Sequence, residues 1–429
     1  MQGVFFIVLC LITFGEFVVN ALGLPTFLRF LPEGMSALLL LYVVFAGTRD
    51  RFRRVAPKYW LAFGAMTVVM LCGIVNSPSG AAPMLSGARF FLRAVPLFFL
   101  PAVMSQNEAQ IGRQLKWLAG LALLQVPLSI YQRWQVMEAG RYSGDDVRGT
   151  LLDSGILSMF EICAVLMLTG LFLKGRIGKL TYAALFLLFL LPTAIDETKV
   201  TVLLLPMGLL VTLIMGSAPQ KRLRYVFMGV VALAIFGALF VPIYNRMEEF
   251  NPYSKERDIK NYFTDQKTLN RYMSSNVTGI GTKLNVRRGD AILIPVRFIA
   301  RDPVTLAFGL GLGSISPAGM GKNFEGPYFA LFQKFVITSF TYFILQVGVF
   351  GIIIIASLFW MVFRDSVTAA HADDSLIAAI AAGWTGVVAL FCVGMLYNIY
   401  HEFPSVTYLY AYFSGLVAAR CVSLKQGEG

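Results

Sequence analysis

The chain has 429 residues, of which 57% are hydrophobic and only 14% charged. A soluble domain of this size cannot bury so much apolar surface, so the composition indicates a membrane protein and excludes an ordinary soluble enzyme. The formal net charge is +12, but many basic residues stand in short clusters between apolar stretches. That pattern sets membrane orientation and argues against nucleic acid as a partner.

The sequence lacks the residue patterns of metal-binding and cofactor-binding sites. The five cysteines lie in apolar stretches or at the end of one, without the spacing of metal ligands. The only histidines are His371 and His401, which is too few for a histidine-based metal site. The sequence contains no P-loop, HExxH or GxSxG motif. We therefore expect neither a metal nor a cofactor.

Apolar stretches follow one another along most of the chain. A transmembrane helix needs about 20 mostly apolar residues, and on that criterion the sequence predicts an all-α, polytopic membrane protein with about twelve spans. The spans lie near 3–22, 32–48, 59–76, 84–104, 115–133, 154–173, 180–195, 198–216, 224–243, 335–363, 375–397 and 404–421. Three regions follow: spans one to nine in 1–243, a large polar loop in 244–334, and spans ten to twelve with a short tail in 335–429.

Lysine and arginine concentrate in alternate short loops. The positive-inside rule makes those loops, and with them both termini, cytoplasmic. The extracytoplasmic loops are then 77–83, 134–153, 196–197, 244–334 and 398–403. Between residues 244 and 325 there are twelve Lys and Arg against eight Asp and Glu. Because long loops cross the membrane regardless of their charge, this basic bias invites a functional explanation.

The most informative part of the large loop is an arginine-led apolar segment. The spacing of its apolar residues predicts a surface helix from Asp290 to Ala300, with Arg288 near its start and Arg301 near its end. Arginine stays protonated and presents a planar fork of donors, which suits it to a phosphate or diphosphate. Contacts with lipid headgroups or with nearby aspartates are the structural alternative. The glycine run 309–313 follows and predicts a tight backbone turn.

Two further outer connections carry charge. Arg148 stands just before the sixth span, where its side chain could enter a cavity at membrane depth or simply anchor the interface. Glu197 and Lys199 belong to a very short polar link between two apolar spans. Charges at membrane depth are costly unless they are paired or wet, so they tend to mark functional cavities. A surface turn is the alternative for both.

Arg89 and Arg93 stand one helical turn apart near the outer end of a span. Two like charges in this spacing repel one another unless an anion or a carboxylate lies between them, and Glu161 is a candidate partner. His401 and Glu402, in the outer loop before the last span, are candidate proton-transfer groups.

The order of these features resembles bacterial O-antigen polymerases (Wzy) and O-antigen ligases. The similarity rests on Arg288, the apolar helix, Asp302-Pro303, the run Phe308–Gly313 and the later segment Leu345–Gly351. Arg148-Gly149-Thr150 is similar to an arginine that precedes an earlier span in that family. Ligases typically carry a histidine in the region that here reads 332–339, which contains none. The resemblance therefore favours a polymerase.

The resemblance implies a GT-C-like glycosyltransferase of the bacterial inner membrane, without a metal, that polymerises undecaprenyl-diphosphate-linked oligosaccharides into a surface or exopolysaccharide at the periplasmic face. Arg288 and Arg148 would stabilise the departing diphosphate. Groups that would support substrate binding are Arg287, Arg301, Lys199, Arg89 and Arg93. Candidates for the base are Glu197, Asp290, His401 and Glu402. Implied partners are the lipid-linked oligosaccharide, the bilayer and, as a further candidate, a chain-length regulator. A glycan ligase and a transporter remain the alternatives.

Overall fold

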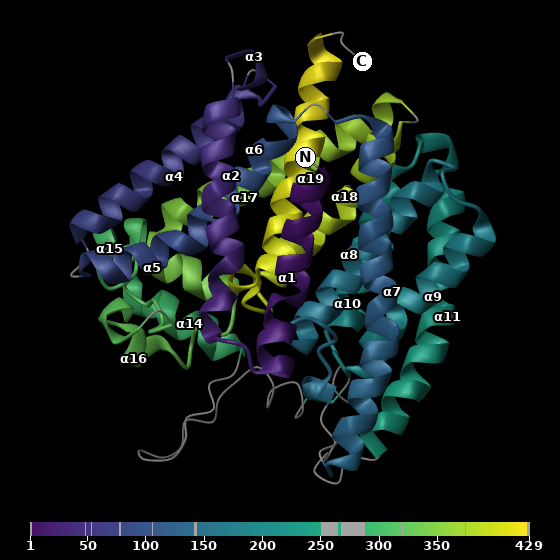
Figure 1. Ribbon diagram of the computed structural model, residues 1–429, viewed down its shortest axis with the longest axis horizontal. Coiled ribbons are helices and arrows are strands. Elements are labelled where there is room, and N and C mark those ends of the chain that lie inside the picture. The colour runs from purple at the N-terminus through teal and green to yellow at the C-terminus, as the bar shows by residue number, and fades with distance from the viewer. Residues whose placement is uncertain are drawn as a thin grey trace.

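The computed structural model describes residues 2–47, 49–52, 54–76, 79–104, 106–140, 144–249, 265–266, 288–319, 321–373 and 375–426. Within these ranges the chain is all-helical and contains no strand (Figure 1). The helices are α1 (Gln2–Leu22), α2 (Leu31–Ala46), α3 (Arg49–Phe52), α4 (Pro57–Asn76), α5 (Ala81–Leu92), α6 (Val95–Val103), α7 (Glu108–Glu138), α8 (Ser154–Leu173), α9 (Lys179–Ile195), α10 (Thr201–Gly216), α11 (Arg222–Glu249), α14 (Arg288–Ile299), α15 (Pro303–Phe308), α16 (Phe329–Phe332), α17 (Ser339–Ala372), α18 (Leu376–Gly394) and α19 (Pro404–Gln426).

The helices agree with the predicted membrane character. Each of the twelve apolar ranges predicted as spans falls on a helix, and the range 84–104 covers the pair α5 and α6. Six helices are long and apolar enough to cross a membrane, and a seventh span results if α5 and α6, bent by 42°, count as one. A multi-pass membrane protein is thus supported, while the count of twelve spans and the single large outer loop stay predictions.

Small residues allow the central helices to approach closely. A Cβ added at Gly383 of α18 would lie 2.7 Å from the Cα of Met167 in α8. One added at Gly386 would lie 3.2 Å from the backbone carbon of Gly208 in α10. Without a hydrophobic driving force between helices in lipid, such close packing holds them together. The most apolar windows of α8 and α18 are accordingly 72% buried, against 17% in the helix that includes α11.

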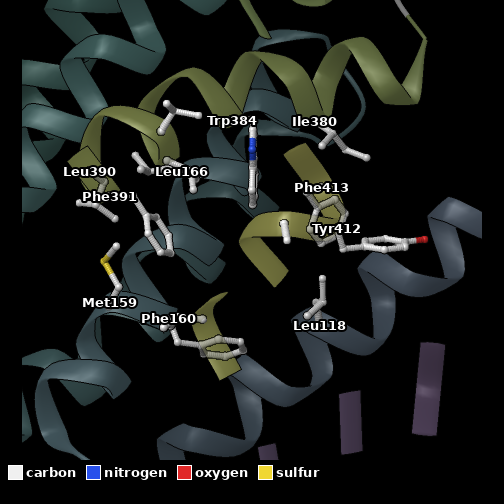
Figure 2. Close-up of a cluster of buried hydrophobic side chains, with 14 of the residues drawn as sticks. Leu118, Met159, Phe160, Leu166, Ile380, Trp384, Leu390, Phe391, Tyr412 and Phe413 are labelled. Carbon is white, nitrogen blue, oxygen red and sulfur yellow. The ribbon is translucent and has the colours of Figure 1, made fainter. Parts of the chain in front are cut away.

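Side chains from α7, α8, α18 and α19 fill the space between these helices. Figure 2 shows Trp384 of α18 among Leu118, Phe160, Leu166 and Phe413, which come from the other three helices. The indole Nε1 of Trp384 donates to the hydroxyl of Ser414, 3.0 Å away, so its polar atom is satisfied inside the core.

The two ends of the bundle carry different segments. The start of α1, the end of α19 and the short basic helix α3 lie toward the upper side in Figure 1, while α14 and α16 lie at the lower side. The helix predicted over Asp290–Ala300 is confirmed as α14 and packs against α17, where the Thr341 hydroxyl donates to the Ala291 carbonyl over 3.1 Å. Which side of the bundle is cytoplasmic stays a prediction.

The glycine run after α15 is inserted between α5 and α17. The backbone N–H of Gly313 donates to the side-chain carbonyl of Gln346 over 2.7 Å, and Leu310 N–H donates to the Leu345 carbonyl over 2.6 Å. Gly313 has φ +81°, and Gly348 has φ +61° inside α17, where it kinks the helix. The tight turn that the sequence predicts is therefore present, and it packs on the broken part of α17.

Candidate functional site

Arg93 closes α5 and holds three distant segments together. Its guanidinium donates to the Glu33 carboxylate of α2 over 2.9 Å and also to the backbone carbonyl of His401. The side chain is only 4% exposed. A buried arginine needs such partners, because an unpaired buried charge costs several kcal/mol. Arg93 therefore fixes the loop before α19 against α2 and α5.

Arg89, one turn earlier in α5, is held differently. Its guanidinium carbon lies 4.6 Å from the Phe90 ring centroid and 5.5 Å from that of Phe30. It makes neither a hydrogen bond nor an ion pair with any residue in the described ranges, and its Nε is buried. Aromatic faces orient the fork of donors without neutralising its charge. Arg89 is thus a half-buried cation without an ion pair among the described residues, and the charges of Glu33 and Glu402 act on it from a distance.

His401 occupies the short helix Tyr400–Glu402 next to these arginines. Its ring is stacked on Tyr342 with centroids 4.1 Å apart, and its Nδ1 lies 3.0 Å from the Ser339 hydroxyl. Nε2 is buried and has no hydrogen-bond partner among the described residues. Burial, and then the charge of Arg93, hold the pKa of His401 well below its ordinary value. Both effects favour the neutral imidazole.

Glu402 follows in the same turn. One of its carboxylate oxygens lies 4.0 Å from His401 Nε2, beyond hydrogen-bond distance. Burial raises the pKa of Glu402, while the charges of Arg93 and Arg89 oppose that shift. The two candidate proton-transfer groups of the sequence are thus neighbours of the two candidate anion-binding arginines.

An apolar cavity of about 320 Å³ lies between the helices next to this polar group. His401 and Ser339 are among its lining residues, whereas Arg89, Arg93 and Glu402 are not. Most of the other lining side chains are apolar or aromatic and come from α4, α5, α6, α17, α18 and α19, among them Phe63, Met66, Phe90, Phe343, Leu358 and Tyr410. An apolar cavity with charged groups nearby suits a ligand with a charged head and a hydrocarbon body.

Arg288, the first residue of α14, lies at the other end of the loop before α19. Its guanidinium carbon is 3.7 Å from the Tyr397 ring centroid. The loop is tied to α17, because the Asn398 carbonyl accepts from the backbone N–H of Ser339 over 2.9 Å. The charge of Arg288 also acts on Tyr400, the neighbour of His401. One loop thus connects Arg288 with the Arg89–His401 group.

Glu197 belongs to a separate group of charges on α7, α8 and the link between α9 and α10. It accepts from Arg133 over 2.5 Å, and the two side chains are 8% and 4% exposed. The N–H of Gly144 donates to its other oxygen over 3.2 Å. Glu197 is therefore committed to a buried ion pair, which makes it a poor candidate for the base.

Glu161 is not the partner of Arg89 or Arg93 that the sequence offered. Its carboxylate is fully buried and has no hydrogen-bond partner in the described parts of the chain. The charge that acts on it is that of Asp196, which itself accepts from Ser158 over 2.9 Å. The partner of Arg93 is Glu33, which a local sequence pattern cannot indicate because it lies 60 residues away.

The remaining predicted residues lie at the surface or in separate contacts. Arg148 forms an ion pair with Asp146 at 3.4 Å. Lys199 lies 5.9 Å from the Tyr244 ring centroid, and Arg301 lies 5.7 Å from that of Phe298. Asp290, in the first turn of α14, is half-buried. Arg287 lies outside the described residues.

No set of three or more histidine, cysteine, aspartate and glutamate side chains in the described ranges could hold a metal ion. No protein-family model matches the chain, and no curated protein matches its sequence. Ser339 and Tyr342, which hold the His401 ring, were not singled out by the sequence. Ser339 and His401 lie 62 positions apart, so a local sequence pattern could not indicate their contact.

Proposed function

We propose that the protein is a membrane glycosyltransferase that polymerises oligosaccharide units carried on undecaprenyl diphosphate. The observation that carries the proposal is Arg89, a half-buried guanidinium with no ion pair among the described residues, whose charge acts on Glu402, the neighbour of the cavity-lining His401. Transfer from a lipid diphosphate requires a cation where the leaving group gains charge and a base near the attacking hydroxyl. Both kinds of group are present here.

The proposed roles follow from the contacts. Arg89 and Arg288 would bind the diphosphate, since each lies on an aromatic ring that orients its donors. Arg93 would keep its place with Glu33 and position the turn that carries His401. The cavity would take part of the hydrocarbon of the lipid carrier. Twelve membrane crossings, a GT-C-like arrangement, an inner-membrane location and cytoplasmic termini belong to the same proposal.

The test uses the purified full chain in lipid vesicles with a synthetic undecaprenyl-diphosphate-linked oligosaccharide. Removing one group that stabilises developing charge typically costs about 100- to 1,000-fold in turnover, so Arg89→Ala should abolish the ladder of longer products. The matched control is Arg297→Ala, which removes an exposed arginine of α14. A normal ladder from Arg89→Ala would refute the proposal. A single transfer to a different lipid acceptor would indicate a ligase.

A transporter is the second candidate, and one observation favours it. The pair α5 and α6 is bent by 42°, and α17 is broken at Gly348. Discontinuous helices of this kind often form the substrate sites of transporters. The same vesicles distinguish the two, because a transporter would move the lipid-linked oligosaccharide across the bilayer without lengthening it.

A further inference from the structure

The hydroxyl of Ser339 has three polar neighbours, and only one arrangement of hydrogens satisfies all of them. Its Oγ lies 3.1 Å from the Asn398 carbonyl, 3.1 Å from the backbone N–H of His401 and 3.0 Å from Nδ1 of the same histidine. A hydroxyl donates one hydrogen bond and accepts two. The backbone N–H of His401 can only donate, and the Asn398 carbonyl can only accept.

The position of one hydrogen on the His401 ring therefore decides how many hydrogen bonds the Ser339 hydroxyl forms. If Nδ1 carries it, Nδ1–H and the backbone N–H both donate to Ser339, whose own hydrogen goes to Asn398, so that three hydrogen bonds form. If Nε2 carries it, Ser339 must donate to Nδ1 and the bond to Asn398 is lost. Nε2–H would then be a buried donor without an acceptor, since Glu402 is 4.0 Å away. A buried orphan donor is unfavourable.

A doubly protonated ring is disfavoured on separate grounds. The ring lies on Tyr342, and Phe343 and Phe90 lie at centroid distances of 5.0 and 5.5 Å, so an added charge would be poorly solvated. The charged and titratable groups that face the ring from the surrounding elements are Glu33 of α2, Arg89 and Arg93 of α5, Tyr342 of α17, and Glu402 of the same turn. The charge of Arg93 opposes a positive charge on the ring, although Arg93 is paired with Glu33.

We propose that Ser339 is a positioning residue that holds His401 as its Nδ1–H tautomer, so that the lone pair of Nε2 is kept available as a proton acceptor. The role of that proton acceptor rests on the proposed function, whereas the tautomer does not. Three further contacts keep the ring in place. Arg93 binds the His401 carbonyl, Tyr342 stacks on the ring, and the Ser339 N–H donates to Asn398. A serine at the first position of α17 can therefore set the direction in which His401 accepts a proton.

In the proposed reaction, the hydroxyl oxygen of the acceptor sugar forms a bond to the anomeric carbon of the lipid-linked donor. The bond from that carbon to the diphosphate oxygen breaks, and its electron pair leaves on the diphosphate. The hydroxyl proton passes to His401 Nε2, and the negative charge of the diphosphate bound by Arg89 offsets the positive charge that the ring then carries. The opposite tautomer would present an N–H at that position and could not accept the proton.

Nitrogen NMR tests the tautomer directly, because the chain contains only two histidines. The full-length protein, labelled with ¹⁵N-histidine in lipid nanodiscs, should give one ring with a protonated Nδ1 and an unprotonated Nε2 at neutral pH. His371→Gln removes the other ring and completes the assignment. Ser339→Ala should shift the population toward Nε2–H, and Ser339→Thr, which keeps the hydroxyl, should restore it. An Nε2–H ring in the wild type, or an unchanged pattern in Ser339→Ala, would overturn the assignment.

Kinetics with the same lipid-linked oligosaccharide test the role of Nε2. Ser339→Ala should lower kcat at least tenfold with little change in KM, and Ser339→Thr should recover most of the loss. A wild-type kcat in both Ser339→Ala and His401→Gln would contradict the positioning role. If neither the wild type nor any variant makes polymer, while NMR shows a protonated Nδ1, then the proposed function fails and the tautomer assignment stands.

Discussion

Replacing Gly313 by alanine separates two reasons for a glycine in the turn that packs on α17. Its φ of +81° is one that a side chain rarely adopts, and an added Cβ would lie 2.6 Å from the Met84 backbone nitrogen and closer still to the Pro83 carbonyl. The left-handed conformation alone costs about 1–2 kcal/mol. Forcing a methyl group into packed backbone adds roughly 1–3 kcal/mol. We therefore expect Gly313→Ala to lose about 2–5 kcal/mol of stability.

Two matched variants isolate the two contributions. Gly140 has φ +67° with nothing within 4 Å, so Gly140→Ala tests conformation alone. Gly326 has no such φ, but its Cβ would lie 2.5 Å from the Ser314 carbonyl carbon, so Gly326→Ala tests crowding alone.

The assay is thermal unfolding of the three purified variants in one detergent. A loss of 1 kcal/mol lowers Tm by about 2 °C in a large chain, so Gly313→Ala should fall by roughly 4–10 °C. It should fall further than either of the other two variants. If Gly313→Ala were no less stable than Gly140→Ala, the close packing of the turn against α5 would be wrong.

Three further predictions concern separate parts of the molecule. Arg288→Ala should abolish polymer at an unchanged protein level, because it removes the guanidinium stacked on Tyr397. Tyr397→Phe keeps the ring and should retain activity. A normal chain length in Arg288→Ala, read from gels of the product, would argue against a diphosphate role. Glu161→Gln should leave Tm within about 2 °C of the wild type, because the buried carboxylate accepts no hydrogen bond from the described residues that the substitution could break. A large drop of Tm in thermal unfolding experiments would mean that the carboxylate has a partner. A reporter enzyme fused at Lys267 should give an extracytoplasmic signal in cells, and a cytoplasmic signal would reverse the predicted orientation.

Local patterns predicted the helices well. Each of the twelve apolar ranges falls on a helix, and the predicted start of α14 is within two residues of the observed one, whereas the short helices α3, α15 and α16 were not predicted. These features depend on hydropathy and on a period of 3.6 residues, which a single sequence records directly.

The contacts between side chains of the site were harder to predict from the sequence. The repulsion between Arg89 and Arg93 correctly required a carboxylate, but Glu33 supplies it and Glu161 does not. The ion pair of Arg133 with Glu197 joins residues 64 positions apart. Such pairs depend on how helices pack, and helix packing in lipid is governed by small residues and shape, which a hydropathy pattern does not describe.

The break at Gly348 changes how α17 relates to the bilayer. A continuous helix of 34 residues would be about 51 Å long, well beyond the hydrocarbon thickness of about 30 Å. The break gives the first nine residues, Ser339–Val347, a direction of their own. These residues are attached to the glycine run 309–313 through the hydrogen bond from Gly313 to Gln346. We expect a thicker or thinner membrane to tilt the segment after Gly348 and to leave the contacts of Ser339 with His401 in place. We therefore expect the hydrogen-bonded end of α17 to respond little to the lipid composition around it.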